Sequence, residues 1–424
     1  MSLVLGIDMG TSACRIAAVD TDNHVHALVR VPLAPPEQVG DRCEQAPETL
    51  WQACTEALGT ILRKIPANDV DAIAVDGTSS TLLLCDAKGN PQGNALMYRD
   101  QRAKAQAERL STIAPLNAAV HSPSSSLAKL LWLKDQGELK PGLKALHQGE
   151  WLTGRLRGRY DTGDENNALK LGYDAFHRHW PGWLAGCGLP IDCLPKIVPA
   201  GTDLGYISPD IARQFGLPSS CRTVAGTTDS TATFLASGAH EVGDGVTVLG
   251  STLVLKICSD RPVFAPEYGI YSHRLGEHWL VGGASNAGGA VLNQYFSNTQ
   301  LTELSEHIDP TSQTGFDYIP LPGVGERFPV NDPELAPCLS PRPDDDAMFL
   351  QGMFEGLARI EQQGYARLAE LGAPALKTLR TGGGGAKNPA WSAIRQAMIP
   401  TQFLPADHEE AAFGSALLAR QARQ

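Results

Sequence analysis

Residues 3–20 read LVLGIDMGTSACRIAAVD, a pattern that predicts a strand, a turn and a second strand. The first apolar run ends in one carboxylate, Asp8, and the turn Gly10-Thr11-Ser12 supplies small residues that let a ligand approach the backbone. Such a turn offers amide N–H groups and hydroxyls to a phosphate, and Asp8 stands where it can hold a hydrated Mg²⁺. An ordinary hairpin is the competing interpretation, because turn chemistry alone selects only Gly, Asn, Asp and Ser.

Length and composition describe a globular protein of more than one domain. The chain has 424 residues, of which 42% are hydrophobic and 19% are charged. A chain of this length is expected to form two or more domains, each with its own core. The net charge of −11 argues against a nucleic-acid partner, because binding to a phosphate backbone relies on Lys and Arg. Backbone amides and a metal can still hold a small anion.

The cysteines and the N-terminus predict the compartment. The nine cysteines are odd in number and form no Cys-x-x-Cys motif, which favours a reducing environment over a disulfide framework or a zinc knuckle. No basic segment precedes an apolar run at the N-terminus, so no signal peptide is expected. No run approaches the ~18 to 20 apolar residues that a spanning helix needs. The sequence therefore predicts a cytoplasmic protein without a membrane partner.

Two further segments repeat the plan of a strand that ends in a small polar loop. An apolar run over 70–75 precedes Asp76-Gly77-Thr78-Ser79-Ser80, and a run from Thr223 precedes Gly226-Thr227-Thr228-Asp229-Ser230. Open α/β sheets place ligand groups at such strand ends. For Asp229, a cap on the short helix expected after it is an alternative role, and the two roles are compatible.

The opening pattern recurs once, in residues 246–257. This stretch reads VTVLGSTLVLKI, again a strand, a Gly-Ser-Thr turn and a strand, and further strands are expected over 269–274 and 279–281. Two copies of such a unit suggest two similar domains that close their hairpins on one ligand.

A glycine run near the C-terminus carries a second chemical signal. Residues 382–385 are four glycines between a predicted strand and a helix, and the helix has Asn388 as N-cap and Pro389 at its first position. Bare backbone at a helix N-terminus leaves room for a flat ring or a phosphate, although a long flexible turn would have the same composition. The Gly-x-x-x-x-Gly-Lys-Ser/Thr motif is absent, because Asn388 follows Lys387. A long amphipathic helix is predicted over 350–371.

The chain resembles the FGGY carbohydrate kinases, which belong to the superfamily of actin, hexokinase and the 70-kDa chaperone ATPases. Motifs that match the family pattern follow one another in the family's order over nearly the whole length. They lie at 6–12, 74–79, 99–103, 129–134, 151–154, 194–199, 224–229, 250–252, 325–327, 383–388 and 411–414.

The resemblance implies an α/β fold of two ribonuclease-H-like (actin/hexokinase-type) domains with the active site in the cleft between them. The first domain would comprise 1–230 plus 403–424 and hold the sugar, and the second would comprise 231–402 and hold the adenosine. Each candidate residue has an implied role. Asp229 would be the general base and a substrate contact. Asp8 would bind Mg²⁺ and the reacting hydroxyl. The ATP phosphates and adenosine would contact Thr11, Ser12, Gly250, Ser251, Thr252, Gly384, Gly385, Asn388 and Trp391. A carboxylate that accepts the alcohol proton suits phosphoryl transfer, which otherwise depends on positioning and charge.

Within the family, the chain is most similar to the short pentulose kinases of cyanobacteria and plants, which implies D-ribulose or, second, D-xylulose as the substrate. Ser79 matches a sugar-contacting position of that group, and Gln45 lies in a loop that resembles the sugar loop of larger members but is altered by Cys43. The alternative from another class is an actin-like or chaperone-like ATPase that binds a protein partner. The sequence leaves the oligomeric state open.

Overall fold

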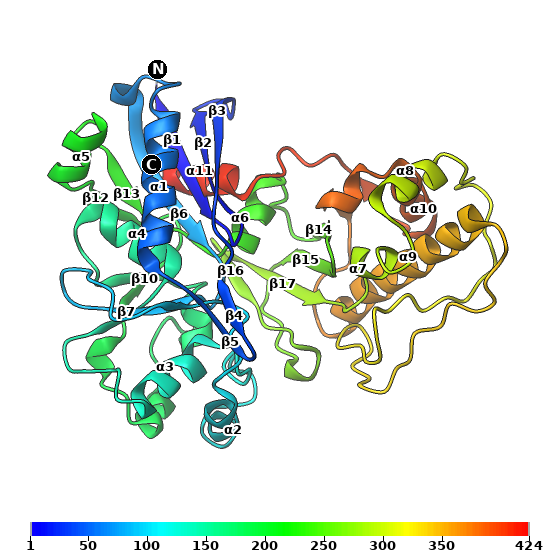
Figure 1. Ribbon diagram of the computed structural model, residues 1–424, viewed down its shortest axis with the longest axis horizontal. Helices are drawn as coiled ribbons and strands as arrows, with labels where there is room; N and C mark the ends of the chain where they lie inside the picture. Colours follow the sequence, from blue (N-terminus) through cyan, green and yellow to red (C-terminus); the bar gives the residue numbers. More distant parts are fainter. Residues whose placement is uncertain (1, 423–424) are drawn as a thin grey trace. The chain divides into compact units, whose positions relative to one another are not determined.

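The computed structural model describes residues 2–422 and divides into two compact units (Figure 1). Unit 1 comprises the described residues up to Ala236, together with His273–Gly276 and the residues from Glu410 onward. Unit 2 comprises Ser237–Ser272 and Glu277–Glu409. Among the described residues, no helix combines the length and the apolar character needed to cross a membrane.

Unit 1 is built on a six-stranded sheet with the order β12-β13-β6-β1-β2-β3. The strands are β1 (Leu3–Met9), β2 (Ala13–Asp20), β3 (Val25–Pro32), β6 (Val70–Gly77), β12 (Asp203–Tyr206) and β13 (Arg222–Val224). β1 pairs with β2 in the antiparallel direction and with β6 in the parallel direction, which confirms the predicted opening hairpin. Every residue of β1 is buried, as expected of a strand covered on both faces.

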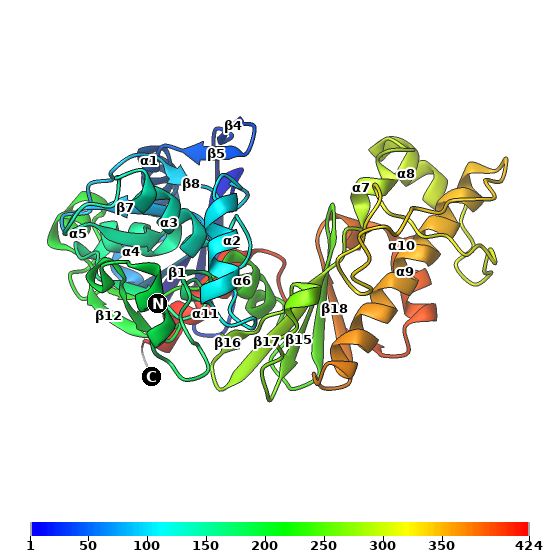
Figure 2. The same cartoon turned by 90° about the horizontal axis from the view of Figure 1, so that it is seen from below.

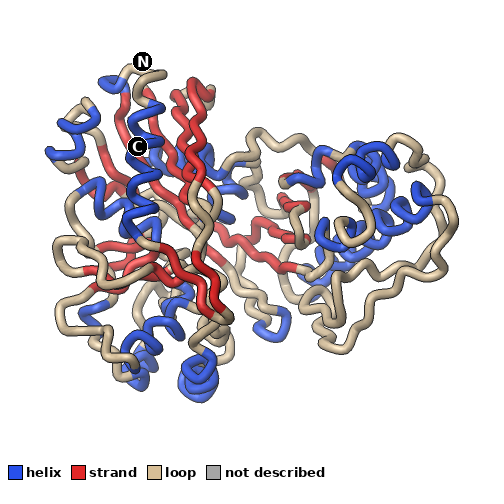
Figure 3. Tube along the Cα trace, in the orientation of Figure 1, coloured by secondary structure: helices blue, strands red, loops and turns tan. Residues whose placement is uncertain are grey.

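The alternation of β1 sends its side chains to two different layers. Leu3, Leu5, Ile7 and Met9 join the core beneath α1 (Pro47–Ile61), and Val4 joins the core beneath α11 (Ala411–Gln421). α11 packs tightly because β1 has Gly6 on that side, where a Cβ atom would lie 1.9 Å from the Ala412 carbonyl oxygen. Asp8 has the same parity as Val4 and Gly6, so it points to the α11 side. Figure 3 shows these strands in red with the helices in blue.

A second layer of unit 1 holds the insertion after β3. Its five-stranded sheet has the order β4-β5-β8-β7-β9, formed by β4 (Glu37–Val39), β5 (Arg42–Gln45), β7 (Leu82–Cys85), β8 (Ala95–Leu96) and β9 (Lys144–His147). The helices after β8 are α2 (Lys104–Ile113), α3 (Ser126–Asp135) and α4 (Gln148–Arg157). The remaining strands and α-helices described in unit 1 are β10 (Thr162–Asp164), β11 (Lys196–Val198), α5 (Pro209–Phe215), α6 (Asp229–Ala236) and β16 (His273–Leu275).

Unit 2 repeats the strand pairing of unit 1. Its strands follow the order β17-β15-β14-β18-β19, with β14 (Asp244–Leu249), β15 (Leu253–Ser259), β17 (His278–Ala284), β18 (Thr378–Gly382) and β19 (Gln402–Phe403). β14 is antiparallel to β15 and parallel to β18, as β1 is to β2 and β6. The predicted repeat is therefore confirmed. The strand expected over 269–274 is only β16, because Pro266–Tyr268 form a 3₁₀ turn that ends at Gly269.

Helices cover the sheet of unit 2. α9 (Asp346–Glu370) lies against β15 and β17 and buries Leu350, Met353 and Leu357, which confirms the predicted amphipathic helix (Figure 2). The other helices are α7 (Gly289–Leu292), α8 (Asn298–Ser305) and α10 (Pro389–Met398). α10 begins as predicted, because Asn388 Oδ1 accepts a hydrogen bond of 3.0 Å from the Trp391 amide.

Candidate active site

Three carboxylates meet at the ends of neighbouring strands of unit 1. Asp8 on β1 and Asp76 on β6 are register partners in the parallel pair, so their side chains leave the sheet on the same face. A bridge between Gly77 and Thr228 then brings Asp229, the first residue of α6, to the end of β6. The structure thus gathers two predicted site residues, Asp8 and Asp229, and adds Asp76.

Asp8 is buried beside one cation. Its Oδ2 accepts a hydrogen bond of 2.9 Å from Nη1 of Arg15, and Nε of the same arginine lies 3.2 Å from Glu410 Oε2. Burial raises the pKa of Asp8 above its ordinary value, and the Arg15 charge opposes that rise. The hairpin thus supplies both the Asp8 carboxylate and the Arg15 guanidinium that forms an ion pair with it.

Asp76 is the most buried of the three carboxylates. Its Oδ2 accepts a hydrogen bond of 2.5 Å from Ser415 on α11, and its Oδ1 is buried without a hydrogen-bond partner. Burial raises the pKa of Asp76 well above its ordinary value, and the neighbouring Asp8 and Asp229 charges act in the same direction. An unpaired carboxylate oxygen beside a second carboxylate is a donor set that suits Mg²⁺.

Sequence reasoning placed Asp76 at a strand end of the ligand-binding kind but assigned it no role. The signal was present, because Asp76-Gly77 ends its strand just as Asp8 precedes the first turn. The missing information was the register, which a sequence does not state and which alone makes these two aspartates neighbours.

Asp229 is half-buried and lies at the N-terminus of α6. Its Oδ1 accepts a hydrogen bond of 2.6 Å from the Ser230 amide, so the side chain does contact its own helix end. This contact is to the amide of the next residue, whereas an N-cap side chain accepts from the second or third amide after it, so the hydrogen bond is not the predicted helix cap. It fixes the carboxylate at the edge of the cluster, where a ligand can reach it more readily than it can reach Asp76.

Ser79 occupies the turn that follows Asp76. The Thr81 amide donates to the Thr78 carbonyl at 3.2 Å and closes the turn, and Ser79 Oγ is buried without a hydrogen-bond partner. Gln45 lies on β5, where its Nε2 donates to the Ala34 carbonyl at 2.9 Å and its Oε1 has no partner. Ser79 therefore belongs to the carboxylate end of β6, whereas Gln45 belongs to the inserted sheet.

The two predicted phosphate hairpins both turn through a glycine and two hydroxyl-bearing residues, but the first turn is one residue longer, because Met9 pairs with Cys14 and Leu249 pairs with Leu253. In unit 1 the Gly10 amide donates to the Ala13 carbonyl at 3.1 Å, and the hydroxyl-bearing residues Thr11 and Ser12 are half-buried and exposed, respectively. In unit 2 the Gly250 amide donates to the Thr252 carbonyl at 3.2 Å, with Ser251 exposed and Thr252 half-buried. Each turn presents hydroxyls and backbone to a ligand, as an oxyanion requires.

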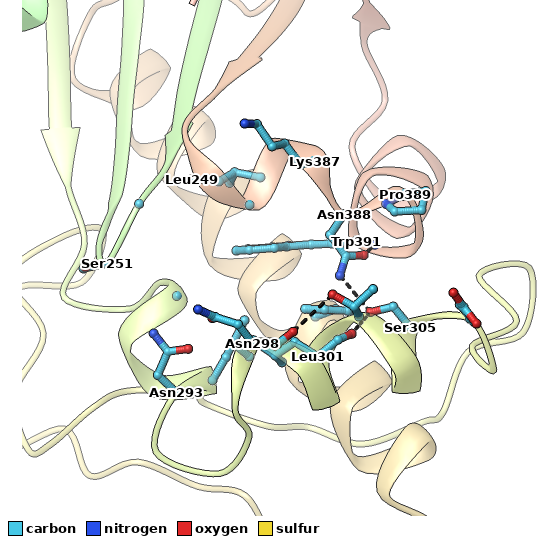
Figure 4. A pocket seen from close by; sticks show the side chains of 18 residues that line it. Leu249, Ser251, Asn293, Asn298, Leu301, Ser305, Lys387, Asn388, Pro389 and Trp391 are labelled. Carbon is cyan, nitrogen blue, oxygen red and sulfur yellow. Dashed lines mark hydrogen bonds between the residues drawn. The ribbon is translucent and has the colours of Figure 1, made fainter. Parts of the chain in front are cut away.

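Unit 2 contains a pocket of about 660 Å³ beside its hairpin (Figure 4). The lining combines the glycine run, the start of α10 and the helix α8 with apolar side chains between them. The lining residues are Leu249, Gly250, Ser251, Gly289, Leu292, Asn293, Asn298, Leu301, Thr302, Ser305, Glu306, Phe354, Gly384, Gly385, Lys387, Asn388, Pro389 and Trp391. Size and composition suit a flat, largely apolar ligand with a few polar contacts.

Trp391 lies within the pocket wall. Its ring stacks on Phe354 with centroids 5.2 Å apart and an interplanar angle of 7°, and a Cβ atom on Gly385 would lie 2.4 Å from the indole. Asn388 crosses to α8, where its Nδ2 donates to Ser305 Oγ at 2.7 Å. Gly385 is thus required by packing. Trp391 shapes the pocket as part of its wall, and its buried Nε1 has no partner.

Comparisons with known proteins agree with this fold. The chain is 24% identical to a xylulose kinase of Bacillus subtilis, over 99% of this chain and 88% of the relative, and 26% identical to a glycerol kinase of Gloeobacter violaceus, over 88% and 75%. Among solved structures, a xyloylose kinase from Brucella ovis superimposes with a TM-score of 0.90 at 22% identity, covering 99% of this chain and 90% of that one. The fold is therefore that of these kinases.

Both units match one family. Residues 3–236 match the N-terminal domain, and residues 242–422 match the C-terminal domain, of the FGGY family of carbohydrate kinases. The two matches span almost all of the chain and contain the three carboxylates, both hairpins and the pocket. The chain therefore belongs to the FGGY family of carbohydrate kinases.

Proposed function

We propose that this kinase transfers the γ-phosphate of ATP to the terminal hydroxyl of a ketopentose, with D-ribulose as the preferred substrate. The observation that carries the proposal is the cluster of Asp8, Asp76 and Asp229 beside the turn with Ser79. A compact set of carboxylates and a hydroxyl can pair with the hydroxyls of a short open-chain sugar, and a site of that kind rejects ligands that leave its buried polar groups unpaired.

Asp229 is the general base of the proposed reaction. Phosphoryl transfer needs one carboxylate to accept the alcohol proton while the oxygen attacks the phosphorus, and otherwise depends on positioning. Asp229 is suited to this task because it is half-buried and fixed at a helix N-terminus, whereas Asp76 is enclosed. Ser79 Oγ and Asp8 are assigned to the sugar hydroxyls, with Gln45 as a further candidate contact.

Asp8 and Asp76 would hold Mg²⁺, because they supply two carboxylates and one unpaired buried oxygen. When bound, the ion offsets the charge of the phosphate oxygens. The phosphates are assigned to the turns with Thr11 and Ser12 and with Gly250, Ser251 and Thr252. Adenosine is assigned to the pocket with Gly384, Gly385, Asn388 and Trp391. We accordingly assign the sugar to unit 1, the adenosine to unit 2, and the reaction to the cytoplasm. The boundaries expected from the sequence shift, because 231–236 and 273–276 belong to unit 1 and 403–409 belong to unit 2.

D-xylulose is the second candidate, because similar proteins from Bacillus subtilis and Escherichia coli are named xylulose kinases. The experiment is an ADP-coupled assay of kcat/KM with D-ribulose, D-xylulose, L-ribulose and glycerol. We expect D-ribulose to give the highest value. A D-xylulose value tenfold or more above D-ribulose, about 1.4 kcal/mol in the transition state, reverses the order of the two sugars. ADP release that needs no sugar favours the ATPase alternative.

A further inference from the structure

A buried lysine lies beneath the turn that carries Ser79. Lys129 on α3 is fully buried, and Nζ donates to the carbonyls of Ser80 at 2.6 Å, Met97 at 3.0 Å and Leu96 at 3.4 Å. All three N–H bonds of the ammonium therefore go to backbone carbonyls of two different segments. Burial lowers the pKa of Lys129 to about 7, which shows how strongly this site disfavours the charge.

The turn above Lys129 holds Ser80 in a backbone conformation that serine rarely adopts. Ser80 has a φ of 74° at the third position of the turn, a geometry that favours glycine because a side chain is strained there. Such a conformation persists only where the surroundings enforce it, and it recurs at ligand sites. The short contact from Lys129 Nζ to the Ser80 carbonyl is an enforcing interaction of this kind.

A second buried side chain holds the start of the same turn. Gln148 Oε1 accepts hydrogen bonds from the Thr78 amide at 3.1 Å and from Thr78 Oγ1 at 2.8 Å. The far end is tied by the Tyr98 amide, which donates to Thr81 Oγ1 at 3.1 Å. Ser79 is the one residue of the turn that is half-buried, while its neighbours are buried and held from below.

We propose that Lys129 is a positioning residue for the sugar: it fixes the turn Thr78–Thr81 so that Ser79 Oγ meets a substrate hydroxyl. This inference rests on the proposed function. It explains why a charge without a described salt bridge is retained in the interior of unit 1. A methionine of similar length would fill the space but would take the Lys129 donor from the Ser80 carbonyl, whereas the Met97 carbonyl would keep the Asp100 amide at 2.9 Å.

The test compares Lys129→Met with Lys134→Met. Lys134 is on the same helix and its Nζ also donates to a carbonyl, that of Cys187 at 3.2 Å, but it lies away from the turn. For Lys129→Met we expect a KM for the sugar that is higher by about tenfold or more, because small misplacements of contacts weaken productive binding strongly. The KM for ATP stays unchanged, and amide hydrogen exchange over 78–82 becomes faster. Lys134→Met changes neither quantity.

Several results would overturn the proposal. One is a folded Lys129→Met protein whose KM for the sugar is unchanged. Another is a Lys129→Met protein whose only change is a lower melting temperature. A third is a Lys134→Met protein whose sugar KM rises as much as that of Lys129→Met. If Lys129→Met does not fold, Ser80→Gly replaces it, because glycine accepts the positive φ and loosens the turn without burying an unpaired group. Faster exchange and a higher sugar KM support the inference, and unchanged values contradict it. If the wild-type protein phosphorylates no sugar, the proposed function is contradicted. In that case, the rate of amide hydrogen exchange over 78–82 in Lys129→Met still decides whether Lys129 holds the turn.

Discussion

Asp229 carries the proton-accepting role in the proposed reaction, and its removal should act on the chemical step. We expect Asp229→Ala to lower kcat by roughly 10² to 10⁴ while ATP binding stays intact, because the loss of a general base does not remove nucleotide contacts. Steady-state kinetics and a separate ATP-binding measurement check this. Turnover equal to that of the wild type would reduce Asp229 to the helix contact with Ser230.

Asp76 combines a proposed role in metal binding with a cost in stability. The folded protein holds the proton of Asp76 more tightly than the unfolded chain does, because its pKa is raised. The free energy of unfolding therefore falls as the pH rises from the unfolded pKa, about 3.9, through the raised folded pKa. An asparagine at this position has the same shape but no charge, so its free energy of unfolding does not fall with pH in this way.

We therefore expect Asp76→Asn to melt at a higher temperature than the wild type at pH 8, with the difference shrinking toward pH 4. Activity should fall, because the variant lacks one of the carboxylates assigned to Mg²⁺. Melting curves at both pH values and kcat at saturating Mg²⁺ test the two parts. If the wild type melts at a higher temperature than Asp76→Asn at pH 8, neighbouring groups compensate the charge of Asp76.

At the scale of elements, the glycine turn and α10 act as one packed unit. Gly385→Ala would push a methyl group into Trp391 and the side chain of Leu249, at 2.4 and 2.8 Å. Overpacking of this kind costs about 1–3 kcal/mol, and it distorts the pocket wall. We expect a lower melting temperature and a higher KM for ATP with an unchanged KM for the sugar.

Gly382→Ala is the matched control, because a Cβ atom there meets no atom within 4 Å. It should leave the KM for ATP unchanged. Equal effects of the two substitutions would show that backbone flexibility, and not the contact with Trp391, is what the turn requires.

Elements with local signals could be predicted from the sequence. The two hairpins, the long helix α9 and the Asn388 cap follow from turn residues, periodicity and capping chemistry within a few positions. What the sequence does not state is which distant segments meet. The pairing of Asp8 with Asp76 and the contact of Lys129 with Ser80 depend on strand register and on packing across 49 or more residues. Trp391 was predicted as a contact, but its stacking on Phe354 was not visible.

At the scale of the molecule, the two units have separate cores and are assigned different ligands. A ligand stabilises the structure that binds it, and the effect grows with its concentration relative to Kd. We expect ADP to slow amide exchange over 249–252 and 383–391, and the sugar to slow exchange over 76–81 and 229–232. Hydrogen-exchange mass spectrometry with each ligand alone tests this. Protection of unit 1 by ADP alone, without any in unit 2, would contradict the assignment of the adenosine pocket.

The packing of α11 on β1 has a consequence for synthesis of the protein. Gly6 lets α11 approach the first strand, and Ser415 on that helix donates to Asp76. The nascent chain therefore exposes the underside of its first sheet until residues 411–421 have left the ribosome. Throughout translation of unit 2, the carboxylate cluster lacks the helix that covers it. Completion of unit 1 thus awaits a segment that follows unit 2 in the chain, and chaperone capture of the nascent chain should end when α11 docks.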